Sequence, residues 1–336
     1  MSQSSYVDSM TPTRLPGQVR AWASSNSALV AMLLLFAFFG LTSQTFLLPN
    51  NIFNIFRQMS VVAVLGIGMT LVILIGGIDL SVGSSLFMAA GISALLLRDG
   101  STAPVAILVG LVAATLVGLL NGLLVEGAGI SPVIATLGTL IGARGLALVL
   151  MDNAQIRVTD PFFDTIAVTR TPGIEALNIP GIPLIAIIVF VLYIITALLM
   201  RHTIYGRMVY AIGGNQTAAR LSGIPVKRIK ILTYTLCGFY AGIAGMLIAA
   251  STGVISPNLG SGSEFYTIAA VVLGGTRLTG GIGRVEKTII GAFILFMTLN
   301  WMTIRRIPTE WQQAATGLLV LAAILIDRLA QRGRAS

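Results

Sequence analysis

Few residues of this chain have side chains that could do chemistry. The only histidine is His202 and the only cysteine is Cys237, which excludes H-E-x-x-H metal sites, histidine proton relays and an intrachain disulfide. The stretch GGIGRVEKT at residues 280–288 comes nearest to a phosphate-binding loop, but it lacks the Gly-Lys pair of G-x-x-x-x-G-K-S/T. We therefore predict no catalytic residues, no metal site and no nucleotide hydrolysis through such a loop.

Three charged residues lie inside or beside long apolar stretches, where a charge raises the free energy of membrane insertion. They are Asp79, Glu126 and Arg144. Asp79 lies in the motif GGIDLSVG, and we expect its carboxylate to cap a helix that starts near Ser81 by accepting free amide hydrogens. Arg144 either pairs with an acidic residue or faces a polar cavity. A proton- or sodium-driven carrier usually needs more such charges, so ion coupling is disfavoured.

The elements that hold these residues must lie mostly in lipid. Of 336 residues, 55% are apolar and only 10% are charged, whereas a soluble domain carries roughly 25% charged residues. This deficit excludes a soluble enzyme and predicts an all-α, polytopic membrane helical bundle. The formal charge of +9 comes from arginines and lysines between apolar runs, so we interpret it as a topology signal rather than as nucleic-acid binding.

Apolar segments predict about ten transmembrane helices. One of them, residues 265–275, rises only about 17 Å against a hydrocarbon core of roughly 30 Å, which predicts a half-helix or a broken span. The ten segments cover residues 28–48, 60–76, 80–97, 105–125, 132–151, 184–200, 231–252, 265–275, 288–304 and 311–326. Glycines four residues apart predict close helix contacts at 118 and 122, at 138 and 142, and at 238 and 242.

The positive-inside rule orients these segments. With both termini cytoplasmic, inside segments hold 14 of the 21 basic residues and outside segments hold six. We therefore predict a cytosolic tail at residues 1–27, a membrane domain at 28–328 and a second cytosolic tail at 329–336. If residues 265–275 only dip into the membrane and return, the C-terminus would instead lie outside.

The cytosolic loop at residues 201–230 carries six basic residues and no acidic residue. Within it, Asn215 or Thr217 could cap a short helix at 216–221, which Gly223 would end. The apolar face of this helix would consist of Ala218, Ala219, Leu221 and Ile224. Such a face suits the groove of a cytosolic partner. The alternative is an interfacial loop whose charges bind anionic lipid.

Three motifs in this order carry a family resemblance: GGIDLSVG at 76–83, the loop at 206–234, and AAVVLGGTRLTGGIGR at 269–284. Together they resemble the permease subunits of ribose-, xylose-, arabinose- and galactose-type ABC sugar importers, and the resemblance covers about residues 45–328. In that family the cytosolic loop couples to the ATP-binding subunit. The positions that match its pattern are Gly213, Gly214, Asn215, Ala218, Ala219, Arg220, Leu221, Ser222 and Gly223.

The resemblance implies a transporter subunit of a bacterial inner membrane, and it also supplies the expected partners. These are a cytosolic subunit that holds ATP and Mg²⁺, a second permease copy (the same chain or a related one) and a periplasmic sugar-binding protein. For the helix break and translocation region we expect Asp79, Ser81, Gly274 and Gly275. A permease of the same kind for a branched-chain amino acid or an autoinducer-type sugar derivative remains an alternative, followed by a secondary carrier or channel and, least favoured, a membrane enzyme.

Overall fold

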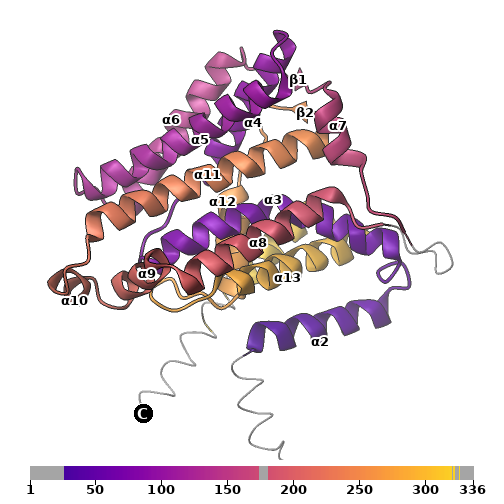
Figure 1. Ribbon diagram of the computed structural model, residues 1–336. Coiled ribbons are helices and arrows are strands. Elements are labelled where there is room, and N and C mark those ends of the chain that lie inside the picture. Colours follow the sequence, from indigo (N-terminus) through magenta and orange to yellow (C-terminus); the bar gives the residue numbers. More distant parts are fainter. Residues whose placement is uncertain (1–25, 174–180, 320, 322–324, 326–336) are drawn as a thin grey trace, which may run out of the picture.

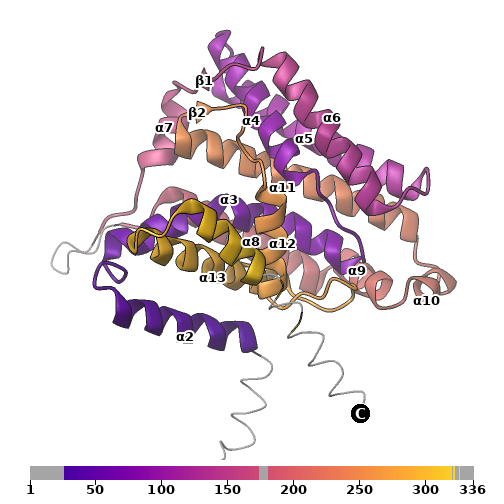
Figure 2. The ribbon, with the colours of Figure 1, turned by 180° about the vertical axis from the view of Figure 1, so that it is seen from behind.

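The computed structural model describes residues 26–173, 181–319, 321 and 325 of the chain (Figures 1 and 2). Apart from Asn26 and Ser27, the two predicted cytosolic tails lie outside these residues. The helices are α2 (Ser27–Thr42), α3 (Pro49–Leu74), α4 (Val82–Arg98), α5 (Ala103–Glu126), α6 (Pro132–Leu150), α7 (Pro161–Val168), α8 (Leu184–His202), α9 (Ile204–Gly214), α10 (Gln216–Leu221), α11 (Val226–Thr252), α12 (Ser263–Leu273) and α13 (Val285–Ile304), and residues 309–319 are also helical. The expected all-α bundle is thus confirmed for this part of the chain.

Six of these helices are long and apolar enough to cross a membrane by themselves, namely α3, α5, α6, α8, α11 and α13. The apolar helices α2, α4 and α12 are shorter. Each of the ten predicted segments contains helical residues, whereas the number of spans stays a prediction.

The start of α3 lies 11 residues before the predicted one, at Pro49 rather than Ser60. The hydropathy pattern excludes its first three turns because they contain polar residues. Proline is well suited to the first position of a helix. Asn51 exchanges two side-chain hydrogen bonds with Asn300 of α13, at 2.9 and 3.0 Å, so that these polar groups satisfy each other.

Helix α3 lies at the centre of the bundle. Its residues from Met59 to Leu74 are all buried, and α11, α13, α12 and α8 pack around it. A helix that is apolar on every side is stable only when other apolar elements surround it. A smaller apolar cluster, which includes Phe39 and Phe46, joins α2 to α13.

Glycines allow α5 and α11 to pack closely. A Cβ atom on Gly118 would lie 2.3 Å from the Tyr234 carbonyl oxygen, and one on Gly238 would lie 2.4 Å from that of Ala114. The same prediction is wrong within this chain for Gly138 and Gly142, where a Cβ would meet nothing within 4 Å. These two glycines lie on a face of α6 that no other described element covers.

The two ends of the bundle carry different structures. In Figure 1, α9 and α10 lie at one end of the long helices, whereas α7 and a small sheet lie at the other. This sheet consists of the two-residue strands β1 (Ile156–Arg157) and β2 (Val254–Ile255), which pair antiparallel with Ile156 opposite Ile255. The described residues of loop 201–230 and residues 152–168 therefore lie at opposite ends of the bundle.

Candidate functional site at the helix breaks

The short helix α10 forms as its local sequence predicts. The side-chain oxygen of Asn215 accepts a hydrogen bond from the backbone N–H of Ala218 at 2.9 Å, which caps the helix. The helix ends at Leu221, and Gly223 follows with a φ of +81°, a conformation that favours glycine. The prediction of a turn, a short helix and a second turn is confirmed.

The side chains of α10 divide into two faces that the apolar pattern does not distinguish. Leu221 is 85% exposed, and Ala218, Arg220 and Ser222 are exposed as well. Ala219 is 4% exposed and belongs to the main apolar core. At about 100° per residue, Ala219 and Leu221 point in nearly opposite directions. Their assignment to one apolar face is therefore wrong, and only the Leu221 side is open to a partner.

The segment before α10 touches the end of α3. A Cβ on Gly213 would lie 1.8 Å from the Leu74 carbonyl oxygen and 2.4 Å from the Gly281 nitrogen. The Gly281 N–H donates a hydrogen bond to that carbonyl at 2.9 Å. Gly214, by contrast, faces open space. The first of these paired glycines is thus a packing contact, and the second is a surface position.

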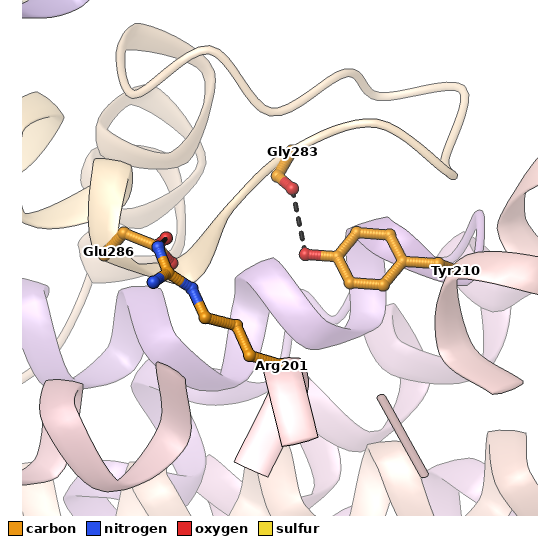
Figure 3. A network of polar contacts seen from close by, with 4 residues as sticks. All are labelled: Arg201, Tyr210, Gly283 and Glu286. Atoms are coloured by element: carbon orange, nitrogen blue, oxygen red, sulfur yellow. Dashed lines mark hydrogen bonds and ion pairs between the residues drawn. The ribbon is translucent and has the colours of Figure 1, made fainter. Parts of the chain in front are cut away.

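Two side chains tie the same region to α13. The Tyr210 hydroxyl of α9 donates to the Gly283 carbonyl oxygen at 3.0 Å, and Arg201 at the end of α8 forms an ion pair with Glu286 (Figure 3). Burial raises the pKa of Tyr210, and the negative charge of Glu286 raises it further. The hydroxyl therefore stays protonated and keeps its hydrogen bond at neutral pH.

A third tie connects α10 to α5. The Lys230 ammonium lies 2.5 Å from the Glu126 carboxylate, and each side chain is only 12% exposed. The same ammonium donates to the Gln216 side-chain oxygen, on the first residue of α10, at 3.3 Å. Lys230 therefore bridges the start of α10 and the end of α5. Sequence reasoning singles out Glu126 but misses its partner.

The first helix break separates α3 from α4 and holds Asp79. This carboxylate is 1% exposed, and its Oδ1 accepts from the Ser81 N–H at 2.9 Å and from the Ser81 hydroxyl at 2.7 Å. Ser81 directly precedes α4, so Asp79 fixes the turn that leads into the helix, close to where capping was expected. Satisfying a buried carboxylate with donors offsets its loss of hydration.

Asn121 of α5 completes this network, although sequence reasoning does not select it. Its side-chain NH₂ donates to the Ser81 hydroxyl at 2.8 Å and to Asp79 Oδ1 at 3.2 Å. Its side-chain oxygen accepts from the Thr139 hydroxyl of α6 at 2.6 Å. The sequence signal that could have identified Asn121 is a single amide side chain in the apolar stretch GLLNGLL. The structure shows that this side chain is fully buried.

The second break follows α12, which is 11 residues long, as the short predicted segment requires. Gly274 packs on α13, where a Cβ would lie 2.6 Å from the Lys287 carbonyl oxygen, and Gly275 has a φ of +87°. The hydrogen bonds of Asp79 go to Ser81 and Asn121 rather than to either of these glycines. The two breaks instead meet at other glycines, since a Cβ on Gly280 would lie 3.0 Å from the Gly76 nitrogen.

Arg144 lies near an acidic residue, Glu264, whose charge attracts it, but its hydrogen bonds go to backbone carbonyl groups. Its guanidinium donates to the carbonyl oxygens of Pro257 and Leu259, each at 3.1 Å, and lies 5.1 Å from the ring centroid of Phe87. It thereby fixes the irregular segment that precedes α12. Among the described residues, no group of three or more potential metal ligands occurs.

Such a bundle, with buried polar groups at interrupted helices, is the architecture of a membrane permease component. The chain belongs to the family described as the branched-chain amino acid transport system permease component, which matches residues 51–324. No solved structure matches the chain.

Individual relatives are similar along nearly their whole length. The ribose import permease protein RbsC of Escherichia coli K12 is 36% identical over 93% of this chain and 96% of its own. The D-allose transport system permease protein AlsC of the same strain is 34% identical over 92% of each chain. The autoinducer 2 import system permease protein LsrC of Salmonella typhi is 34% identical over 90% of this chain and 84% of its own.

Proposed function

We propose that this chain is the membrane permease subunit of an ABC importer that moves a monosaccharide, ribose or a related sugar, into a bacterial cell. The similarity to ribose and allose permeases over more than nine-tenths of the chain supports a sugar as the substrate. The predicted absence of a phosphate-binding loop supports the view that ATP and Mg²⁺ bind to a separate subunit.

The observation that carries this proposal is the position of α10. Leu221 points outward at the tip of a capped helix, while Gly213, just before that helix, packs on the end of α3. A subunit that gripped the Leu221 side would therefore act on a helix end next to the first break. This is the arrangement that coupling of ATP binding to a change of access requires.

The remaining parts of the proposal concern the assembly. A second permease copy would pair with this one, a sugar-loaded binding protein would dock at the end that carries α7, and both termini would be cytoplasmic after ten spans. The structure supports this orientation in one respect, because the end of α2 that leads to the N-terminus faces the same way as α9 and α10 in Figure 1.

The decisive experiment reconstitutes the chain in liposomes with its ATP-binding subunit and binding protein. We expect uptake of labelled ribose or allose only when ATP and all subunits are present. Uptake by the chain alone would identify a secondary carrier, and ATP-driven uptake of autoinducer 2 in place of any sugar would move the chain to that substrate class.

A pair of matched variants tests the docking surface. Leu221→Ala removes an exposed side chain from α10, whereas Leu41→Ala removes one that is 90% exposed at the opposite end of the bundle. We expect only Leu221→Ala to weaken co-purification of the ATP-binding subunit, with both variants still inserted in the membrane. Equal co-purification of the two variants would contradict the assignment.

A further inference from the structure

Two cavities lie in line along the seam between α8 and α13. The first, of about 500 Å³, is here called the arginine cavity and is lined by Arg201, Arg207, Tyr210, Arg284 and Glu286. The second, of about 340 Å³, is here called the apolar groove, and the side chains around it are all apolar. The residues that line it include Met32, Phe36, Phe56, Phe190, Ile290 and Phe293.

Helical geometry places both cavities on the same side of the two helices. Phe190 and Arg201 are 11 residues apart on α8, which is close to three full turns, so they share one face. On α13, Ile290 and Phe293 follow Glu286 by four and seven residues, which also keeps them on one face. The apolar groove therefore begins about one turn beyond the arginine cavity.

The excess positive charge of the arginine cavity favours an anionic ligand. The lining of this cavity includes three arginines and one carboxylate. That carboxylate already pairs with Arg201 (Figure 3). Arg207 and Arg284 are exposed and leave two positive charges in excess. A phosphate group is a fitting counterpart, because the planar guanidinium group binds two of its oxygens at once.

The apolar groove indicates that the phosphate group belongs to a molecule with an apolar chain. Its walls come from α2 and α8, with Met32 and Phe36 on one side and Phe190 on the other. Its floor contains Phe56 of α3, whose ring centroid lies 5.3 Å from that of Phe293 and 6.3 Å from that of Phe190. A free phosphate ion would make no favourable contact with these apolar side chains, whereas the acyl chain of a lipid would pack against them.

We infer that the seam between α8 and α13 is a binding site for an anionic phospholipid, with the phosphate headgroup in the arginine cavity and one acyl chain in the apolar groove. From Arg201 to Phe190 the site extends about 16 Å along α8, which accommodates most of an extended acyl chain. Basic pockets between membrane helices at the cytoplasmic surface are suited to anionic headgroups. The bound lipid would join α2, α8 and α13 next to the contacts of α9.

Native mass spectrometry of the purified full-length chain tests this site, with phosphatidylglycerol and phosphatidylcholine as the probes. We expect the chain to retain phosphatidylglycerol preferentially. The double variant Arg207→Gln/Arg284→Gln should bind it roughly 30-fold more weakly, which is about 2 kcal/mol when 1.4 kcal/mol corresponds to tenfold. The matched control is Arg220→Gln/Arg228→Gln, which removes two exposed arginines outside both cavities.

A second variant tests the acyl-chain half of the site. Ile290→Trp should fill part of the apolar groove and lower retention of phosphatidylglycerol while leaving the two free arginines in place. Three results would overturn the inference: equal retention by the double variant and its control, equal binding of the two lipids, or displacement of the lipid by an equal concentration of inorganic phosphate. Because lipid binding is measured on the chain alone, this result is independent of whether the chain transports sugar.

Discussion

The adjacent glycines Gly213 and Gly214 give the sharpest test of how the loop before α10 is joined to the bundle. Both match the same family pattern, yet only at Gly213 would a Cβ meet another part of the chain. A Cβ there would lie 1.8 Å from the Leu74 carbonyl oxygen, whereas ordinary contacts begin at 3.4 Å. In Gly213→Ala the two backbone segments must therefore move about 1.6 Å farther from each other. In Gly214→Ala the new methyl group meets nothing within 4 Å.

The cost of Gly213→Ala follows from these contacts. Overpacking against atoms that cannot rotate away costs about 1–3 kcal/mol. The new methyl group also intrudes on the hydrogen bond from Gly281 to Leu74, whose loss costs about 1 kcal/mol more. Replacing glycine by alanine within a helix also stabilises the folded state by about 0.5–1 kcal/mol. This gain applies equally to Gly213→Ala and Gly214→Ala. We therefore expect a net loss of about 2 kcal/mol for Gly213→Ala and a small gain for Gly214→Ala.

Two assays on the reconstituted importer separate these outcomes. A loss of 2 kcal/mol corresponds to a roughly 30-fold lower population of the packed arrangement. We expect Gly213→Ala to lower the midpoint of thermal unfolding and to reduce ATP-driven uptake, while the ATP-binding subunit still associates through the Leu221 side of α10. Gly214→Ala should behave like the wild type. Equal stability and uptake in the two variants would refute the reasoning.

Substitutions at Asp79, Arg144 and Lys230 test the remaining contacts. Asp79→Asn weakens the acceptor of the Ser81 and Asn121 hydrogen bonds, and we expect it to reduce uptake about tenfold while the protein still folds. Asp79→Leu removes that acceptor and should lower the yield of folded protein. Wild-type uptake in both variants would contradict this role. Arg144→Met removes two hydrogen bonds to the loop before α12 and should destabilise the chain by about 2 kcal/mol in thermal unfolding, with partial recovery in Arg144→Lys. Lys230→Met leaves the partly buried Glu126 carboxylate unpaired and should speed hydrogen exchange of the α10 amides. The additional substitution Glu126→Gln should partly reverse this effect. Unchanged exchange in Lys230→Met would contradict the connection between α10 and α5.

Local features of the fold could be predicted because their causes are local. The cap of α10 is one side chain bonded to an amide three residues later, and α12 is short because its apolar segment is short. The early start of α3 is missed for the opposite reason. Its first turns contain polar residues, and the pairing of Asn51 with Asn300 that satisfies them spans 249 positions.

The ties of the candidate site could not be predicted in the same way. Lys230 pairs with a carboxylate 104 residues earlier, and Arg144 binds carbonyl groups more than 110 residues later. Neither residue shows its partner by spacing. Among the glycines, an identical four-residue spacing lies in a tight contact at Gly118 and on an uncovered face at Gly138.

The sequence by itself determines that this chain is a helical membrane protein, where its helices lie and which motifs relate it to permeases, because hydropathy and capping depend on neighbouring residues. Only the tertiary structure decides which face of each helix points inward. In a soluble protein, polar residues mark the outward face, but lipid favours apolar side chains there as the core does. The contacts that join α10 to the two breaks therefore become visible only when the helices are packed together.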